Sequence, residues 1–487
     1  MSLFIRLIRT AVGIVAIAAG LSVPIGPATV MAAGPPPLVL PKEALHELRQ
    51  LAIQHNGRHK PFDSFAREML QQITGSPRWR DQDPVLTVLS ITLHPEPWQE
   101  EPLLSVPFRP LREAIGLESS TAHVSYNALV STRKLMRLLP PIVQKQRQDE
   151  KLTMLEEETM DAFGRFRALS DLLEQRLELV PPASGTTNAS WHPIFEPGSF
   201  SPEQQQALTD RWTDATAAIR SGRPEAVVKT VRALSEGLRA ANPAAYPAAW
   251  RLSLEVWYHH VAPFHAARVM YLIAVLGLLW GLARKTRWSV RAGMAAMMAA
   301  AAIHLGGILL RVVLGGRPPV SNFYETMLWL PFVAVALALV FERLYRAGYF
   351  GLAASALAAI VLTLADYVPL DSSIAPVVAV LRSNLWLTVH VLTIVASYGA
   401  LALAAVLAHV YGGLYVARRS AATLEPLGLF LYRTIQVGVV LLAGGIMLGA
   451  VWANASWGRY WGWDPKETWA LITLLWFLAL LHGRMAG

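Results

Sequence analysis

A stretch near the end of the sequence combines flat aromatic side chains with charged ones. It reads WGRYWGWDPKETWALIT from position 457 and runs into a long apolar segment. Indole faces bind large planar ligands, and cations beside them bind carboxylates. A planar ligand that carries carboxylates, such as a porphyrin, suits this composition. The residues concerned are Trp457, Arg459, Trp461, Trp463, Asp464, Lys466 and Trp469.

An interfacial belt is the alternative interpretation, because tryptophan is common at the surface of a membrane. The 457–469 cluster is denser than a belt requires, and Gly458, Gly462 and Pro465 predict a shaped loop. The isolated tryptophans, for which we expect only the interfacial role, are Trp280, Trp288, Trp329 and Trp476.

Histidines inside apolar segments are the second group of candidates. An ionisable side chain is costly within a membrane and is often functional there, and a neutral imidazole can bind haem iron axially. A packed or hydrogen-bonded core histidine is the alternative. The histidines concerned are His304, His390, His409 and His482, and we expect a structural role for His409.

These residues must be positioned by membrane helices, since the chain of 487 residues is 53% hydrophobic and only 16% charged. The apolar segments are close to the ~20 residues that a spanning helix needs. We expect an all-α polytopic membrane protein with a mainly α N-terminal region outside the cytoplasm. The seven core spans are expected at 267–283, 290–314, 325–341, 350–366, 386–416, 434–454 and 468–482.

An eighth apolar segment lies within residues 1–33, at about 10–32, and fits either a cleaved signal peptide or a retained anchor. Both place residues 34–265 on the outer side, and the distribution of basic residues agrees because Lys and Arg are retained inside. The inner flanks then hold Arg6, Arg9, Arg284, Lys285, Arg287, Arg291, Arg343, Arg346, Arg418, Arg419, Arg433 and Arg484. The short outer loops hold Arg311, Arg317, Arg382, Arg459 and Lys466.

The outer region 34–265 has helical spacing and a capping-box start in SFSPEQQQ. The Pro, Gly and Ser content of 181–199 predicts a linker or long loop, with two lobes as one interpretation. HKPFDSFARE, from His59, is expected to be an amphipathic surface segment. The chain has no cysteine, which excludes disulfides, thiolate metal sites and its own CxxCH haem attachment. The charge of +9 is spread among loops, so no nucleic-acid partner is expected.

Three segments together resemble a known family. WGRYWGWDPKETWALIT resembles the WWD signature of haem-handling proteins, and its WDPKETWALI wording is similar to the CcsA/ResC family of cytochrome c biogenesis proteins (System II). LGGILLRVVLGGRPPVSNFYETM at 305–327 resembles the family's segment with a SN-x-YE loop, and RSNLWLTVHVLTIVASYGAL at 382–401 its histidine-bearing helix start. The resemblance covers about 268–487, so a CcsA-like domain is expected at 266–487.

The resemblance implies haem binding and cytochrome c maturation in a bacterial inner membrane, with the tryptophan stretch on the periplasmic side. Haem b would be the bound substrate, and apocytochrome c and a ResB/CcsB-type membrane protein the partners. His390 matches the family's outer haem ligand and His482 its intramembrane one, with His304 as an attractive partner for His482. Arg459, Lys466 or loop amides would meet the propionates. The chain would be a component of a cytochrome c haem lyase.

One family feature has no counterpart. The family normally has a further span and a second outer histidine after the WWD stretch. Either the chain is truncated or split, or another residue substitutes, with His259, His260 and His265 as candidates. The remaining alternatives are a haem exporter or chaperone without ligase activity, a System I protein of the CcmC or CcmF type, and an unrelated transporter with an aromatic cage. Asp464 and Glu467 would shape the loop or bind the substrate.

Overall fold

The computed structural model describes the chain from residue 38 to 486, apart from three short gaps and four single residues. The described ranges are 38–117, 122–183, 190–196, 200–346, 348–368, 370–376 and 384–486, with the single residues 35 and 198. The expected signal or anchor segment, residues 1–33, lies outside them. Packing divides the chain into two compact units, and their boundary falls between His260 and Val261. Each unit is described by itself.

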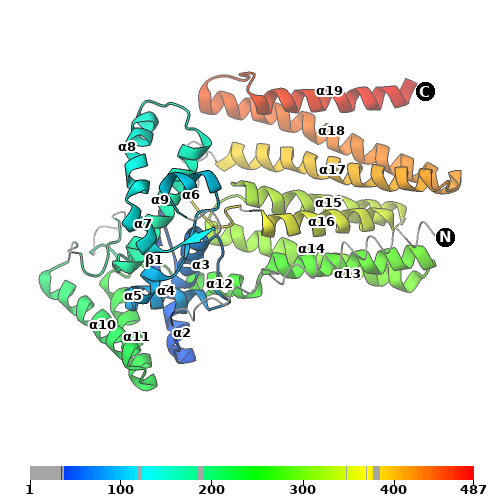
Figure 1. Cartoon of the computed structure of the whole chain (residues 1–487). Coiled ribbons are helices and arrows are strands. Elements are labelled where there is room, and N and C mark those ends of the chain that lie inside the picture. The colour runs from blue at the N-terminus through cyan, green and yellow to red at the C-terminus, as the bar shows by residue number, and fades with distance from the viewer. Residues whose placement is uncertain are drawn as a thin grey trace. The chain divides into compact units, whose positions relative to one another are not determined.

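The first unit is mainly helical, as expected, with two short antiparallel sheets (Figure 1). In the first sheet β1 pairs with β2 through the turn Asn56-Gly57, where both residues have positive φ, as a tight hairpin requires. The elements are α2 (Lys42–Arg49), β1 (Ala52–His55), β2 (Arg58–Pro61), α3 (Phe62–Thr74), α4 (Pro84–Leu93), α5 (Pro95–Glu100), β3 (Leu104–Ser105), α6 (Arg109–Ile115), β4 (His123–Val124), α7 (Tyr126–Thr132), α8 (Lys134–Arg147), α9 (Met154–Leu173), α10 (Pro202–Ser221), α11 (Pro224–Ala241) and α12 (Ala249–Val261).

One hydrophobic core runs through this unit. It takes Leu172 from before the segment 181–199, Trp191 and Ile194 from within it, and Leu208 from after it. The segment therefore joins parts of one unit, and the packing does not show two lobes. The expected helix start is present, because Ser201 and Gln204 form a reciprocal capping box at α10.

The prediction of a surface segment at HKPFDSFARE is wrong. Lys60 and Asp63 are only 1% and 0% exposed. Lys60 forms an ion pair with Glu68, and Asp63 lies 2.8 Å from Nε of Arg67 and 3.5 Å from Nη1 of Arg49. Charged residues are almost never fully buried unless they are paired, and here the hairpin and α3 bring the partners together.

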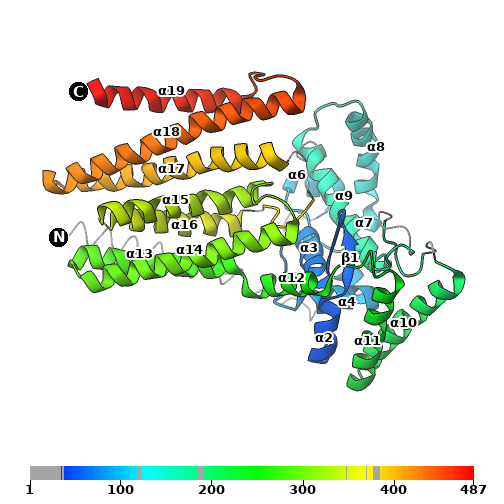
Figure 2. The same ribbon diagram turned by 180° about the vertical axis from the view of Figure 1, so that it is seen from behind.

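The second unit contains the seven membrane-length helices that hydropathy predicted, and the prediction is confirmed for the described residues. Successive helices run antiparallel (Figures 1 and 2). They are α13 (Pro263–Arg284), α14 (Arg287–Gly315), α15 (Phe323–Tyr345), α16 (Tyr349–Tyr367), α17 (Asn384–Val416), α18 (Ala421–Trp457) and α19 (Pro465–Ala486).

Small residues allow these helices to approach closely, as is common in membranes. A Cβ atom on Gly277 of α13 would lie 3.1 Å from the Cα atom of Gly293 on α14. α15 lies between α16 and α17, and α18 lies between α17 and α19 in both views (Figures 1 and 2). No residue of α19 is buried, because α18 is its main neighbour.

Candidate functional site: a histidine and a tryptophan-rich loop at one end of the bundle

His390 is held by a backbone carbonyl of the neighbouring helix. Its Nδ1 atom lies 2.9 Å from the oxygen of Gly445 on α18. A carbonyl oxygen can only accept, so Nδ1 carries the proton and the neutral ring keeps its free lone pair on Nε2. No described residue forms a hydrogen bond with Nε2. The ring is therefore in the tautomer that can bind a metal through Nε2.

Trp452 connects this histidine to the tryptophan-rich stretch. Its ring is 6.2 Å from the His390 ring with 10° between the planes, and 4.7 Å from the Trp457 ring at 72°. The guanidinium carbon of Arg459 lies 5.5 Å from the centre of the Trp457 ring. The structure thus brings His390, Trp457 and Arg459 to one site. Sequence reasoning missed Trp452, although its spacing of seven from Gly445 places both on one face of α18.

Residues 458–464 form the tryptophan loop between α18 and α19. α18 ends at Trp457, and its C-cap Gly458 has a left-handed φ of 71°. Trp463 has a φ of 57°. The Asp464 side chain accepts a hydrogen bond from the backbone N–H of Glu467 at 2.8 Å, as a helix N-cap does. The Glu467 side chain accepts one from the backbone N–H of Gly462 at 2.7 Å. Asp464 and Glu467 therefore shape the loop, which was one of the two expected roles.

The tryptophans of the loop do not present one continuous flat surface. The rings of Trp461 and Trp463 are 5.7 Å apart and nearly perpendicular, at 84°. One planar ligand can therefore lie flat on only one of the two. Trp463 and Trp469 are 69% and 67% exposed. The indole nitrogens of Trp452 and Trp461 are buried, and no described residue accepts their hydrogen.

The two cations of the stretch differ in their pairing. Arg459 Nη1 lies 3.5 Å from Oε1 of Glu467, whereas Lys466 is exposed and has no ion-pair partner in the part of the chain that the structure describes. Of the two, Lys466 is the freer to meet a carboxylate of a ligand.

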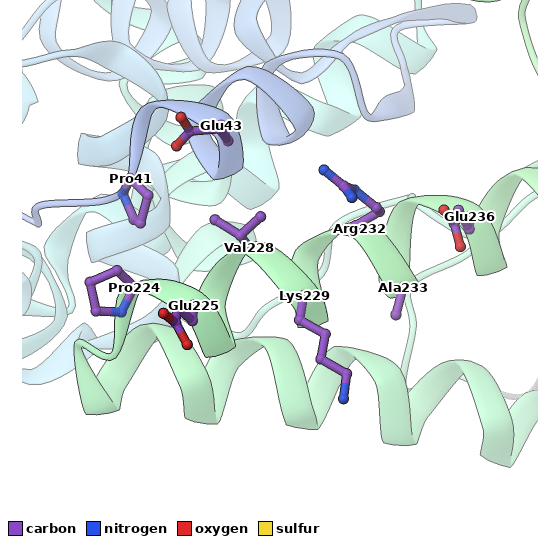
Figure 3. Close-up of a pocket in the computed structure, with 9 residues that line it drawn as sticks. All are labelled: Pro41, Glu43, Pro224, Glu225, Val228, Lys229, Arg232, Ala233 and Glu236. Carbon is purple, nitrogen blue, oxygen red and sulfur yellow. The ribbon is translucent and has the colours of Figure 1, made fainter.

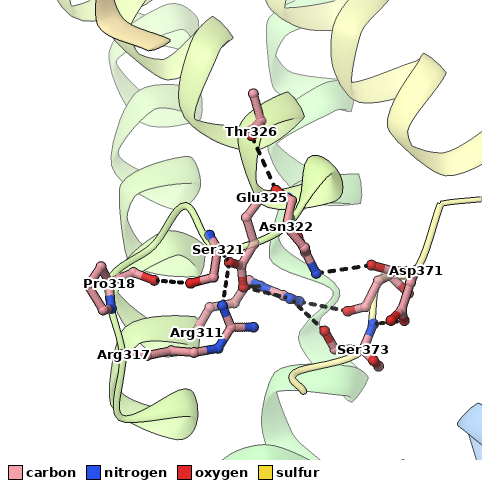
Figure 4. Close-up of polar contacts among 10 residues, drawn as sticks. Arg311, Arg317, Pro318, Ser321, Asn322, Glu325, Thr326, Asp371 and Ser373 are labelled. Atoms are coloured by element: carbon pink, nitrogen blue, oxygen red, sulfur yellow. Dashed lines mark hydrogen bonds and ion pairs between the residues drawn. The ribbon is translucent and has the colours of Figure 1, made fainter. Parts of the chain in front are cut away.

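The SN-x-YE segment forms a buried polar clamp (Figure 4). Oε1 of Glu325 accepts a hydrogen bond from Nη2 of Arg311 at 3.0 Å, and Oε2 accepts one from Nη1 of Arg317 at 2.8 Å. Arg311 also donates to the carbonyl oxygens of Ser372 and Ser373. The clamp therefore joins α14, α15 and the connection that leads to α17, the helix of His390.

Trp329, expected to be a belt tryptophan, also touches α17. Its Nε1 lies 3.3 Å from the carbonyl oxygen of Leu392, two residues beyond His390. Its ring packs against Phe332 at 5.7 Å. Trp329 is thus part of the packing that holds α17, whereas Trp476 is 68% exposed.

His304 is fully buried in an aromatic box. Phe264, Tyr271 and Phe332 surround it edge-on at 5.6 to 6.0 Å, and its Nδ1 lies 3.3 Å from the hydroxyl of Tyr271. Its Nε2 has no partner among the described residues. His304 is 0% exposed, so the side chains packed around its ring leave no room for a porphyrin. The proposal that it binds iron would require the box to open.

His482 lies near the end of α19 and is exposed. Its Nδ1 bonds to the carbonyl of Leu478 on its own helix, at 2.8 Å, so its Nε2 also keeps a free lone pair. The structure does not bring it to His304, because α14 and α19 lie on opposite sides of α17 and α18 (Figures 1 and 2). A hollow of about 520 Å³ at this end is lined by Tyr411, Tyr415 and Arg484, among others.

His259 and His260, two of the three candidates for a second outer ligand, belong to the first unit. His265, the third candidate, belongs to the second unit. Nη2 of Arg268 lies 2.6 Å from Nδ1 of His265. Arginine can only donate, so the neutral ring of His265 carries its proton on Nε2 and offers iron no lone pair there. His265 lies on α13, and α15 and α16 lie between α13 and α17 (Figure 1).

A hollow of about 660 Å³ in the first unit lies between α2 and α11 (Figure 3). Its lining mixes acidic and basic side chains, such as Glu43 and Arg232, and contains neither histidine nor an aromatic ring. Within the described residues, no group of three or more His, Asp or Glu side chains could hold a metal ion.

Comparison with known proteins gives the chain its class. A family model described as "Cytochrome C assembly protein" matches residues 320–487. Protein NrfI of Wolinella succinogenes is 28% identical over 463 residues, which cover 88% of this chain and 49% of that protein. The chain thus spans about half the length of NrfI.

Shorter relatives match less than half of this chain. The cytochrome c biogenesis protein CcsA of Synechococcus sp. (strain CC9605) is 33% identical over 255 residues, covering 45% of this chain and 82% of that protein. CcsA of Guillardia theta is 35% identical over 213 residues, which cover 37% of this chain and 70% of that protein. With the seven membrane-length helices, these matches define a multi-pass membrane protein of cytochrome c biogenesis. Within that class the chain belongs to the CcsA family.

Proposed function

We propose that this protein binds haem b as its substrate, presents it at the tryptophan loop and supports its covalent attachment to the CxxCH motif of an apocytochrome c. The observation that carries the proposal is the hydrogen bond from His390 to the carbonyl of Gly445, because it leaves Nε2 ready to bind iron. Histidine ligands of metals commonly donate their other ring N–H in this way. The CcsA family membership supports the same conclusion.

In this proposal each group of the site has a separate task. His390 supplies one axial nitrogen, and burial of the porphyrin against indole faces supplies much of the affinity. Lys466, which is exposed, would meet a propionate. A second axial ligand would come from a partner of the ResB/CcsB type. His482 would hold haem toward the other end of the bundle.

We assign no residue of the chain as an acid or a base in the attachment reaction. Each cysteine thiol of the apocytochrome adds across one vinyl group: the S–H bond and the π bond of the C=C break, a C–S and a C–H bond form, and nothing leaves. Holding the two reactants together supplies a large effective concentration. The site must therefore leave the vinyl edge accessible, and the first unit would help to recruit the apocytochrome or the membrane partner.

The proposed location is the bacterial inner membrane, with the first unit and the tryptophan loop on the periplasmic side. Because the chain has no native cysteine, single cysteines can report the side of each loop. Ser221→Cys, at the end of α10, should react with an impermeant maleimide in intact spheroplasts, and Ser420→Cys, before α18, only after permeabilisation. The reverse pattern would contradict the proposed orientation.

Co-expression with a CxxCH reporter tests the function. The chain, together with a ResB/CcsB-type partner, should produce a reporter that retains haem in denaturing gels. His390→Ala should abolish this while membrane yield is unchanged. A chain that purifies with haem but never yields covalent reporter haem would instead be an exporter or chaperone, which was the alternative. A chain without haem would contradict both.

A further inference from the structure

We propose that Gly445, Gly449 and Trp452 form a seat on α18 that fixes the tautomer and the ring plane of His390, and thereby the plane in which haem is held. This inference rests on the proposed function, because it concerns the same ligand. The three residues follow the spacing i, i+4 and i+7 and so lie on one face of the helix. That face is turned toward His390 on α17.

The first component of the seat is the carbonyl of Gly445, which accepts the Nδ1–H of His390 at 2.9 Å. It excludes the other neutral tautomer, in which Nδ1 would have a lone pair facing the carbonyl oxygen. The glycine also permits the approach of the helices, since a Cβ atom at position 445 would lie 3.0 Å from the backbone Cα of Ile394. Ile394 is one helical turn beyond His390.

The second component is the absence of a side chain at Gly449. A Cβ atom there would lie 2.7 Å from Cε1 and 3.0 Å from Nδ1 of His390. Cβ atoms do not come this close to ring atoms, and the ring is already fixed by its hydrogen bond. A methyl group at 449 must therefore push the imidazole out of its place. By contrast, a Cβ atom at Gly444, on the same helix, would meet nothing within 4 Å.

The third component is Trp452, whose ring lies within 10° of the His390 plane. Iron bound to Nε2 lies in the imidazole plane, so a porphyrin on that iron stands perpendicular to this plane. Trp452 is then edge-on to the porphyrin and acts as a positioning residue. Trp457, turned 72° from Trp452, is free of that restriction and can face the porphyrin.

Chemical rescue tests the seat. His390→Gly removes the imidazole but leaves the seat empty, so added imidazole should restore the haem spectrum of the purified full-length chain reconstituted with haemin. Adding Gly449→Ala to His390→Gly should weaken this rescue about tenfold or more, because the methyl group occupies the space of the imidazole. The matched control, Gly444→Ala with His390→Gly, should be rescued like His390→Gly alone.

The outcomes separate the inference from the function on which it rests. Equal rescue of the Gly449→Ala and Gly444→Ala double variants would overturn the seat but leave His390 as the ligand. A parent chain without haem, or a His390→Gly spectrum identical to the parent's, would overturn the ligand assignment and the seat with it. As a second readout, Trp452→Leu should change the rescued spectrum while Trp476→Leu leaves it unchanged.

Discussion

Arg311 and Glu325 form an ion pair inside the helical bundle, with 3.0 Å between Nη2 and Oε1 and side-chain exposures of 3% each. Breaking one partner of a buried pair leaves an uncompensated charge and costs about 3–5 kcal/mol. Glu325→Gln would leave two buried arginines without their carboxylate. We therefore expect a large loss of thermal stability in the detergent-purified chain.

The control for this variant is Glu113→Gln. Glu113 pairs with Arg109 at 2.8 Å, but the two side chains are 54% and 69% exposed. Exposed pairs contribute about 0–1 kcal/mol, so the melting temperature should hardly change. Hydrogen exchange should rise at α14, α15 and residues 370–376 in Glu325→Gln only. Equal melting of both variants would show that the clamp does not stabilise the bundle.

The second prediction concerns Trp329. Trp329→Phe keeps an aromatic ring but removes the donor to the carbonyl of Leu392, and a lost hydrogen bond of this kind costs about 1 kcal/mol. The melting temperature should fall by a few degrees. Trp476→Phe, at an exposed position, should leave it unchanged. If both variants melt like the parent, Trp329 is a belt residue after all.

The third prediction is a pH dependence at Glu68. Burial tends to raise the pKa of this carboxyl, but the hydrogen bond to His55 and the charge of Lys60 outweigh it, so the pKa lies below its ordinary value of 4.5. The folded state then holds its proton less tightly than the unfolded state. The resulting stability is complete above about pH 4.5 and is lost as the pH falls through the lowered pKa.

Glu68→Gln should therefore increase hydrogen exchange in α3 relative to the parent at pH 7, and the difference should shrink as the pH falls below 4.5. Glu203→Gln, at an exposed position, serves as the control and should match the parent at each pH. A difference at Glu68→Gln that grows toward acid pH would contradict the sign of this argument.

The fourth prediction follows from the perpendicular rings of the loop. Trp461→Ala and Trp463→Ala should reduce bound haem to different extents, because a planar ligand stacks flat on only one of the two rings. Haem per chain, measured by pyridine haemochrome absorbance at matched membrane yield, decides this. Equal losses in both variants would show that the two rings are not arranged this way around the ligand.

The sequence predicted the helices better than it predicted the contacts between them. Hydropathy located all seven described spans, because the length of each apolar segment is set by membrane thickness. It could not locate the seat of His390, since Gly445 contributes only a backbone oxygen, 55 residues away in the chain. A periodicity search of α18 could have singled out Gly445, Gly449 and Trp452 as one face, but not its partner.

Buried charges were the other failure of sequence reasoning. Lys60 and Asp63 were expected at the surface because charged residues usually lie there. Their burial depends on partners that the fold supplies, such as Arg49 on α2, which is 3.5 Å from Asp63. For the tryptophans, composition indicated a planar ligand, but the angle between Trp461 and Trp463 depends on a left-handed residue within the loop. Such an angle cannot be inferred from the spacing of the residues.

The haem content of His390→Ala tests the central claim most directly. His409→Ala is the matched control, because His409 lies on the same helix and, among the described residues, bonds only to the carbonyl of Ala405 on its own helix. The parent and His409→Ala should purify with the same haem content and Soret spectrum, whereas His390→Ala should lose most of the haem or show an altered spectrum at equal membrane yield. A His390→Ala chain with the parent's haem content and spectrum would contradict the assignment of His390 as the haem ligand.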